Sequence, residues 1–111
     1  DCLGAYLDRN GLDFTGLFII SGYAALEVYK AFSDRGIAIP DDVSIVAHDD
    51  PAGSQFMCPP LDCIRNDEKL SIEAAHIELK KVVEGKQPFF HLRQEPTLIE
   101  RHSVRTIPVM R

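Results

Sequence analysis

The protein is a chain of 111 residues with 12 lysine and arginine and 17 aspartate and glutamate residues, a formal net charge of −5, and 45% hydrophobic residues. These proportions exclude a disordered, collagen-like or membrane-embedded chain, and the longest stretch without a charge, residues 14–26, is too short to cross a bilayer. The acidic balance also argues against a surface that grips nucleic acid through clustered lysine and arginine.

The first residues and the cysteines suggest where the chain comes from. Residues 1–4 contain no initiator methionine and no basic segment, so we expect neither a signal peptide nor a natural start. The three cysteines Cys2, Cys58 and Cys63 are an odd number, which disfavours a disulfide framework, and their spacing disfavours zinc. We therefore expect buried thiols in a reducing, cytoplasmic compartment, with no metal and no cofactor.

Helix and strand patterns alternate in the first third of the chain. Apolar residues at helical spacing predict a helix that starts near Cys2 and is ended by Asn10-Gly11. A continuous apolar run at residues 17–20 predicts a strand buried on both faces. Helical spacing returns over residues 24–32, and Gly36 ends this second helix.

The middle of the chain contains a second strand between two turns. The proline and aspartates of residues 37–42 predict an extended segment that ends in a turn. Residues 43–47 then form a second apolar run, which we expect to be a buried strand, and residues 51–60 read as a loop. A short extended piece follows at residues 61–65.

The last part of the chain contains the longest expected helix. Asn66 or Asp67 can cap this helix, which we expect over residues 68–84 with an apolar stripe from Leu70 to Val83. Two further extended segments are expected at residues 89–92 and 97–104. Helices that alternate with strands, joined by connections too long for hairpins, predict parallel strands in a layered α/β fold.

Polar residues follow both apolar strands of this fold, where ligands of parallel sheets bind. Ser21-Gly22 comes after the first strand, and His48-Asp49-Asp50 comes after the second. Adjacent carboxylates repel each other unless each has a partner or faces water. Neighbouring side chains of an extended segment point oppositely, so one carboxylate can face the crevice while the other caps a loop or pairs with a base. A carboxylate in the crevice would suit the neighbouring hydroxyls of a sugar.

Other interpretations of these residues remain open. Both aspartates can simply cap a turn, or they can bind Mg²⁺ in an enzyme or phospho-acceptor, although the chain lacks the further acidic and lysine residues that such a site requires. The Ser21 hydroxyl can cap a helix or bind a ligand. Gly22 can allow a close backbone approach, and His48 can titrate, pack or remain solvated. We identify no catalytic residue and expect no enzyme.

Four ordered motifs resemble the effector-binding domains of LacI/GalR-type transcription regulators. Residues 36–46 are similar to the family's "G-x-x-V-P-x-D-V-S-V-V", and Asp49-Asp50 follow. Residues 59–61 are similar to the start of its "P-P-L-T-T", and residues 98–103 are similar to its "L-x-x-R-x-S". The resemblance extends over residues 11–104.

The resemblance implies a bilobed, periplasmic-binding-protein-like α/β domain that binds a sugar or related small metabolite between its lobes. Ligand binding would shift the population of lobe angles and so control a separate DNA-binding domain, outside this chain, in a cytoplasmic homodimer. Asp49 matches the cleft aspartate that accepts hydrogen bonds from ligand hydroxyls, and Ser21 matches a polar residue that faces the ligand. Gly22, His48 and Glu68 are the further candidates for ligand binding.

The chain departs from the family pattern at the same positions. Gly22 stands where the family often has aspartate, His48 replaces an aromatic residue, and Glu68 lies near the cleft at a position that is aromatic in some members. These changes bear on which ligand is bound rather than on the fold.

The resemblance also implies that residues 1–104 are the C-terminal portion of a larger domain and that residues 105–111 are a tail. The chain would cross between lobes near residues 59–65 and 89–97, which places the long helix in the N-terminal lobe. The alternative is a periplasmic or extracellular sugar-binding component of an importer, which shares the fold.

Overall fold

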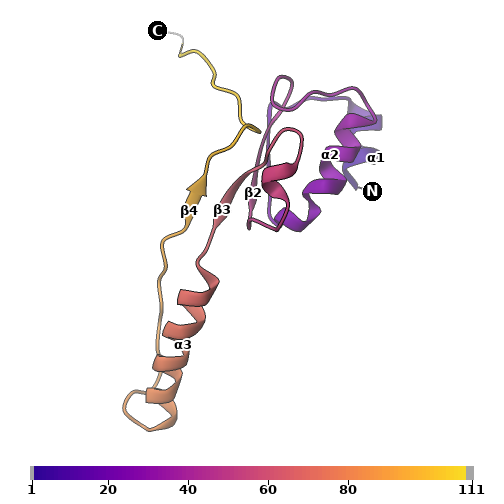
Figure 1. Ribbon diagram of the computed structural model, residues 1–111. Helices are drawn as coiled ribbons and strands as arrows, with labels where there is room; N and C mark the ends of the chain where they lie inside the picture. The colour runs from indigo at the N-terminus through magenta and orange to yellow at the C-terminus, as the bar shows by residue number, and fades with distance from the viewer. Residues whose placement is uncertain (1, 110–111) are drawn as a thin grey trace. The chain divides into compact units, whose positions relative to one another are not determined.

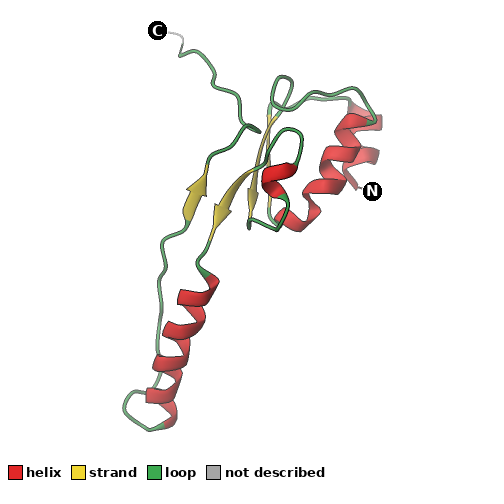
Figure 2. Cartoon of the chain, in the orientation of Figure 1, coloured by secondary structure: helices red, strands yellow, loops and turns green. Residues whose placement is uncertain are grey.

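The computed structural model describes residues 2–109, which form helices and a four-stranded sheet of order β1-β2-β3-β4 (Figures 1 and 2). The elements in chain order are α1 (Cys2–Asn10), β1 (Gly16–Ile19), the short 3-10 helix η1 (Gly22–Ala24), α2 (Ala25–Ser33), β2 (Ser44–His48), a second 3-10 helix η2 (Ser54–Phe56), β3 (Asp62–Arg65), α3 (Glu68–Val83) and β4 (Thr97–Ile99).

The first three strands of the sheet are parallel, as the alternation of helices and strands predicts. Leu17 of β1 lies opposite Ile45 of β2, and Ala47 of β2 lies opposite Cys63 of β3. The last strand, β4, is the neighbour of β3, and Figure 1 shows the two running in opposite directions. The sheet is therefore mixed, with one antiparallel strand at its edge.

The hydrophobic core lies between the sheet and the helices α1 and α2. Its buried members from both layers are Leu7, Ile19, Ala25, Phe32, Val43, Ile45, Ala47, Leu61 and Cys63. Successive side chains of a strand point to opposite faces, so the central strand β2 contributes every second residue, Ile45 and Ala47, to this core. The α/β class predicted from the sequence is thus confirmed.

The prediction that the first strand is buried on both faces is wrong. Ile19 is buried, but its neighbours Phe18 and Ile20 are 54% and 81% exposed. Among residues 2–109, the buried core lies on the face of β1 that carries Ile19. An unbroken apolar run therefore does not tell whether the second face is covered within this chain.

Local signals position the helix ends as expected. Gly11 has a φ of +68°, and its N–H donates to the Leu7 carbonyl, the left-handed ending that glycine favours. At the start of α3 the Asp67 carboxylate accepts a hydrogen bond of 2.9 Å from the Leu70 N–H, so Asp67 is the cap. The expected boundaries of the longest helix are confirmed to within one residue.

Two strand predictions near the C-terminus need correction. Residues 89–92 have no regular structure, and the segment expected over residues 97–104 is a strand only at Thr97–Ile99. A strand requires a neighbouring strand to satisfy its main-chain groups, and the sheet of the described residues ends at β4. The apolar side chains of residues 89–92 are therefore not sufficient to form a strand.

The chain divides into two units. The first contains the residues up to Arg65 together with those from Leu98 onward, and the second contains Asn66–Thr97. The chain thus leaves the first unit after β3 and returns to it within β4, at the edges of the ranges where we expect it to cross between lobes. No helix within residues 2–109 is long and apolar enough to span a membrane.

The cysteines differ in their burial. All three are free thiols, and only Cys63 is buried, whereas Cys2 and Cys58 are exposed. The expectation that the thiols are buried therefore holds only for the cysteine in the sheet.

Candidate functional site

The segments that follow β1 and β2 meet at one edge of the sheet. Because Ile19 pairs with Ala47, the residues after these two strands leave the sheet side by side. A Cβ atom placed on Gly22 would lie 2.6 Å from the Asp49 carbonyl oxygen and 2.8 Å from Cδ of Pro51. Gly22 does allow a close backbone approach, and within this chain its partner is the turn that carries Asp49.

Asp49 presents a half-exposed carboxylate at this edge. It has a φ of +77°, and its N–H donates a 2.9 Å hydrogen bond to the Ile64 carbonyl at the end of β3. Its side chain is 39% exposed, and one carboxylate oxygen lies 3.4 Å from Nδ1 of His48. An exposed carboxylate of this kind can accept hydrogen bonds from ligand hydroxyls.

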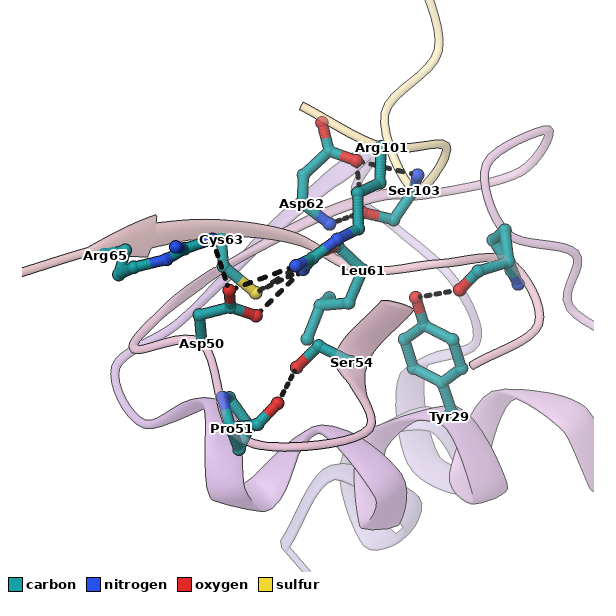
Figure 3. A network of polar contacts seen from close by, with 11 residues as sticks. Tyr29, Asp50, Pro51, Ser54, Leu61, Asp62, Cys63, Arg65, Arg101 and Ser103 are labelled. Carbon is teal, nitrogen blue, oxygen red and sulfur yellow. Dashed lines mark hydrogen bonds and ion pairs between the residues drawn. The ribbon is translucent and has the colours of Figure 1, made fainter. Parts of the chain in front are cut away.

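Asp50 has the opposite environment, because two arginines surround it (Figure 3). Its side chain is 11% exposed and accepts hydrogen bonds from both terminal nitrogens of Arg101, at 2.9 and 3.0 Å. The Arg65 guanidinium lies 3.1 Å away. The hydrogen bonds and charge of Arg101, with a smaller effect of Arg65, hold the pKa of Asp50 below its usual value. The expectation that one of the two aspartates pairs with a base is met by Asp50.

Arg101 connects three parts of the first unit. Besides binding Asp50 it donates a 2.7 Å hydrogen bond to the Leu61 carbonyl just before β3, and it lies 3.6 Å from the Cys63 sulfur (Figure 3). Burial raises the pKa of the Cys63 thiol. The sequence gives one signal for this role, since Arg101 is the arginine of the "L-x-x-R-x-S" motif, but the motif does not name the partner.

Ser103, the serine of the same motif, is fully buried against β2 and β3. Its hydroxyl donates to the Ile45 carbonyl at 2.6 Å. The same hydroxyl accepts from the Asp62 N–H at 2.7 Å, and the Ser103 N–H donates to the Asp62 carboxylate at 2.9 Å (Figure 3). These hydrogen bonds attach the segment after β4 to β2 and to the start of β3. We did not identify Ser103 or Asp62 as structural anchors from the sequence.

The remaining candidates are Ser21 and Glu68. Ser21 begins the short helix η1, but its side chain makes no capping hydrogen bond, so the capping interpretation is not supported. Glu68 is the first residue of α3 and belongs to the second unit. The structure thus brings Ser21, Gly22, His48 and Asp49 to one sheet edge and places Glu68 in the other unit.

Three hollows lie near these elements. The one that includes a candidate residue, Gly22, has about 270 Å³ and is also lined by residues 51–54. A second of about 160 Å³ adjoins the ion pair of Asp50 and Arg101 and is bordered by residues 51–55. Another of about 500 Å³ runs along α2 and includes neither His48 nor Asp49. Within residues 2–109 no group of three or more histidine, cysteine, aspartate or glutamate residues is placed to hold a metal ion.

Comparisons with known proteins agree on one type of domain. The family described as a periplasmic binding protein-like domain matches residues 5–104. The HTH-type transcriptional repressor PurR of Haemophilus influenzae strain PittEE is 32% identical over 111 residues, which cover 96% of this chain and 33% of the repressor. The chain thus spans about a third of the length of the curated relatives it matches.

Solved structures show the same fold. A lac repressor dimer bound to operator and the anti-inducer ONPF is similar with a TM-score of 0.84 and 21% identity, over 95% of this chain and 37% of that one. A LacI family transcriptional regulator from Enterococcus faecalis with bound ribose has a TM-score of 0.77 and 24% identity, over 95% of this chain and 40% of that one.

Proposed function

Because the chain belongs to the periplasmic binding protein-like family, and to its LacI/GalR-type regulators, we propose that it senses a small molecule for a DNA-binding transcription regulator. The resemblance seen in the four motifs is confirmed by the family match over residues 5–104. We propose that residues 1–104 are the C-terminal portion of a bilobed effector-binding domain and that residues 105–111 are its tail.

The main observation in support of ligand binding is that Asp49 and Asp50 have different environments. Two adjacent carboxylates follow β2; Asp50 is neutralised by Arg101 and Arg65, while Asp49 keeps 39% of its side chain exposed. A carboxylate that forms no ion pair with an arginine of the same chain can accept hydrogen bonds from a ligand. We propose Asp49 as the principal ligand-binding residue, with Ser21 and His48 beside it. Glu68, which belongs to the second unit, is a separate candidate for ligand binding.

We propose a sugar or a related small metabolite as the ligand. Asp49 offers two acceptor oxygens, which suits neighbouring hydroxyls, and the similar regulator from Enterococcus faecalis was solved with bound ribose. Gly22 has no side chain and lies against the Asp49 carbonyl, so any contact that it makes with the ligand is through its main chain. The chemistry proposed here is binding without catalysis.

The wider arrangement follows from the same family. We propose that the ligand changes the balance between two lobe arrangements, that a part outside this chain binds DNA, and that the protein acts as a cytoplasmic homodimer. Two similar proteins, a transcriptional repressor and a lac repressor dimer bound to operator, support a regulator over a component of an importer.

The test uses the full-length protein, a panel of sugars that includes ribose, and an operator DNA selected in vitro. We expect one sugar to change DNA affinity, and we expect Asp49→Ala to weaken sugar binding roughly tenfold or more, since a hydrogen bond to a charged group is lost. DNA binding without sugar should survive in this variant.

Asp41→Ala is the matched control, because Asp41 is an exposed aspartate in the turn before β2. Its sugar affinity should equal that of the unmodified protein. Unchanged sugar binding in Asp49→Ala would refute the role of Asp49, and a protein that binds no DNA and no sugar would refute the proposed function.

A further inference from the structure

Asp49 has a main-chain conformation that its surroundings must maintain. Its φ of +77° makes it the one residue other than glycine with a positive φ among residues 2–109. Most side chains disfavour this left-handed region, and aspartate, which tolerates it better than most residues, adopts it at single positions where local contacts favour it. The direction of the Asp49 carboxylate therefore depends on what holds the turn.

Two main-chain contacts hold the turn. The Asp49 N–H donates to the Ile64 carbonyl at 2.9 Å, and the Asp49 carbonyl lies against Gly22, where a Cβ atom would come within 2.6 Å. The first contact attaches Asp49 to β3, and the second leaves no space for a side chain at position 22. Neither contact alone fixes the residue that follows.

The following residue is fixed by its side chain. Arg101 binds both oxygens of Asp50 at 2.9 and 3.0 Å, and the two side chains are only 14% and 11% exposed. Arg101 is itself attached to the Leu61 carbonyl at 2.7 Å (Figure 3). A two-pronged arginine pair with low exposure restricts both position and rotation, which a lysine cannot do.

We propose that Asp50 and Arg101 are positioning residues, which hold the turn after β2 so that Asp49 stays in its left-handed conformation and directs its carboxylate to the ligand. This proposal rests on the proposed function for its binding consequence only. The conformational consequence is a property of the chain itself and can be measured without a ligand.

The first experiment measures amide hydrogen exchange at Asp49 in the full-length protein carrying Arg101→Met, Arg101→Lys or Asp50→Asn. We expect exchange of the Asp49 N–H to become roughly tenfold faster in each variant, because its bond to Ile64 opens more often. The Ser44 N–H, which donates to the Thr15 carbonyl at the other end of β2, should keep its rate and so report an intact sheet.

The matched control is Arg35→Met. Arg35 also binds both oxygens of an aspartate, Asp8, at 2.9 and 3.0 Å, but this pair joins α1 to the end of α2. Its loss should leave the Asp49 exchange rate unchanged. A rate at Asp49 within twofold of the unmodified protein in a folded Asp50→Asn or Arg101→Lys variant would overturn the proposal.

The second experiment measures ribose and the other sugars of the panel by calorimetry. We expect Arg101→Lys, which retains the charge, to bind the active sugar several-fold more weakly while its unfolding temperature stays close to that of the unmodified protein. Equal affinity in the two proteins would overturn the positioning role. If the unmodified protein binds no sugar, the proposed function fails, and exchange at Asp49 alone decides the positioning role.

Discussion

The helices of the two units both follow an apolar periodicity and are followed by a glycine of positive φ, but they are buried differently. In the first unit, α2 has 9 residues, of which Ala25, Ala31 and Phe32 are buried, and Ala25 and Phe32 belong to the core that includes the strands. In the second unit, α3 has 16 residues, a side-chain cap and a glycine ending, and none of its residues is buried. Caps and periodicity therefore determine where a helix lies, whereas stability comes from the layer against which it packs.

The largest expected effect is the loss of stability when a phenylalanine is removed, which should differ between the two units. Phe32 is 0% exposed, so Phe32→Ala should lower the free energy of unfolding by roughly 3–5 kcal/mol. Phe89 of the second unit is 76% exposed, and Phe89→Ala should change it by no more than about 0.5 kcal/mol. Urea denaturation of the two variants of this 111-residue chain, to which these exposures apply, measures both. A loss in Phe89→Ala as large as in Phe32→Ala would contradict the comparison.

The next effect compares two serines that fasten loop segments. Ser103→Ala removes the hydroxyl that joins Ile45 to Asp62 and leaves buried main-chain groups unpaired, which should cost roughly 1–3 kcal/mol. In the second unit the Ser71 hydroxyl contacts the Asp67 carbonyl and Gln94 in a less buried place, so Ser71→Ala should cost at most about 1 kcal/mol. Thermal unfolding of both variants tests this order, and its reversal would show that β4 and the following segment are not anchored at Ser103.

A smaller effect tests whether α3 depends on its cap. Asp67→Ala removes the acceptor of the Leu70 N–H and should cost about 1 kcal/mol. Hydrogen exchange should then increase in the first turn of α3 and remain unchanged in α2. The control is Glu73→Ala, an exposed substitution within the same helix that removes no cap. Equal exchange in the two variants would mean that the cap does not determine the start of α3.

The smallest effect is a dependence on acid that belongs mainly to the first unit. The pKa of Asp50 is lowered from 3.8 by Arg101, so the ionised form stabilises the folded state above about pH 3.8, and this contribution is lost as the pH falls further. Gln87 and Lys81 also lower the pKa of Glu78 in the second unit, but solvent screens that exposed group. The difference in stability between the unmodified protein and Asp50→Asn should therefore shrink below pH 3.8. A constant difference down to pH 2 would contradict the ion pair.

Features determined by neighbouring residues could be predicted from the sequence. The start of α3 and the glycine ending of α1 depend on contacts within four residues. The sequence predicts the glycine ending and limits the cap to Asn66 or Asp67, of which the structure shows Asp67. The exposure of Phe18 and the absence of a strand at residues 89–92 depend on which elements lie nearby, and periodicity contains no such information.

The candidate site likewise has some features that the sequence predicts and others that it does not. The position of Asp49 and Asp50 after β2 follows from the strand pattern, and the pairing of one of them with a base follows from charge repulsion. The base itself, Arg101, is 51 residues away in sequence, and its motif does not indicate that Asp50 is its partner. The contact of Gly22 with the Asp49 carbonyl likewise requires the register of β1 and β2.

The attachment of Ser103 also affects the order in which the chain can fold during synthesis. Ser103 binds Asp62 and Ile45, which leave the ribosome 41 and 58 residues earlier. At a rate of synthesis of about 5–20 residues per second, Ser103 is made roughly 2 to 8 s after Asp62. During that time the whole second unit is synthesised, so the nascent first unit exposes an unpaired sheet edge that chaperones or other nascent chains can reach.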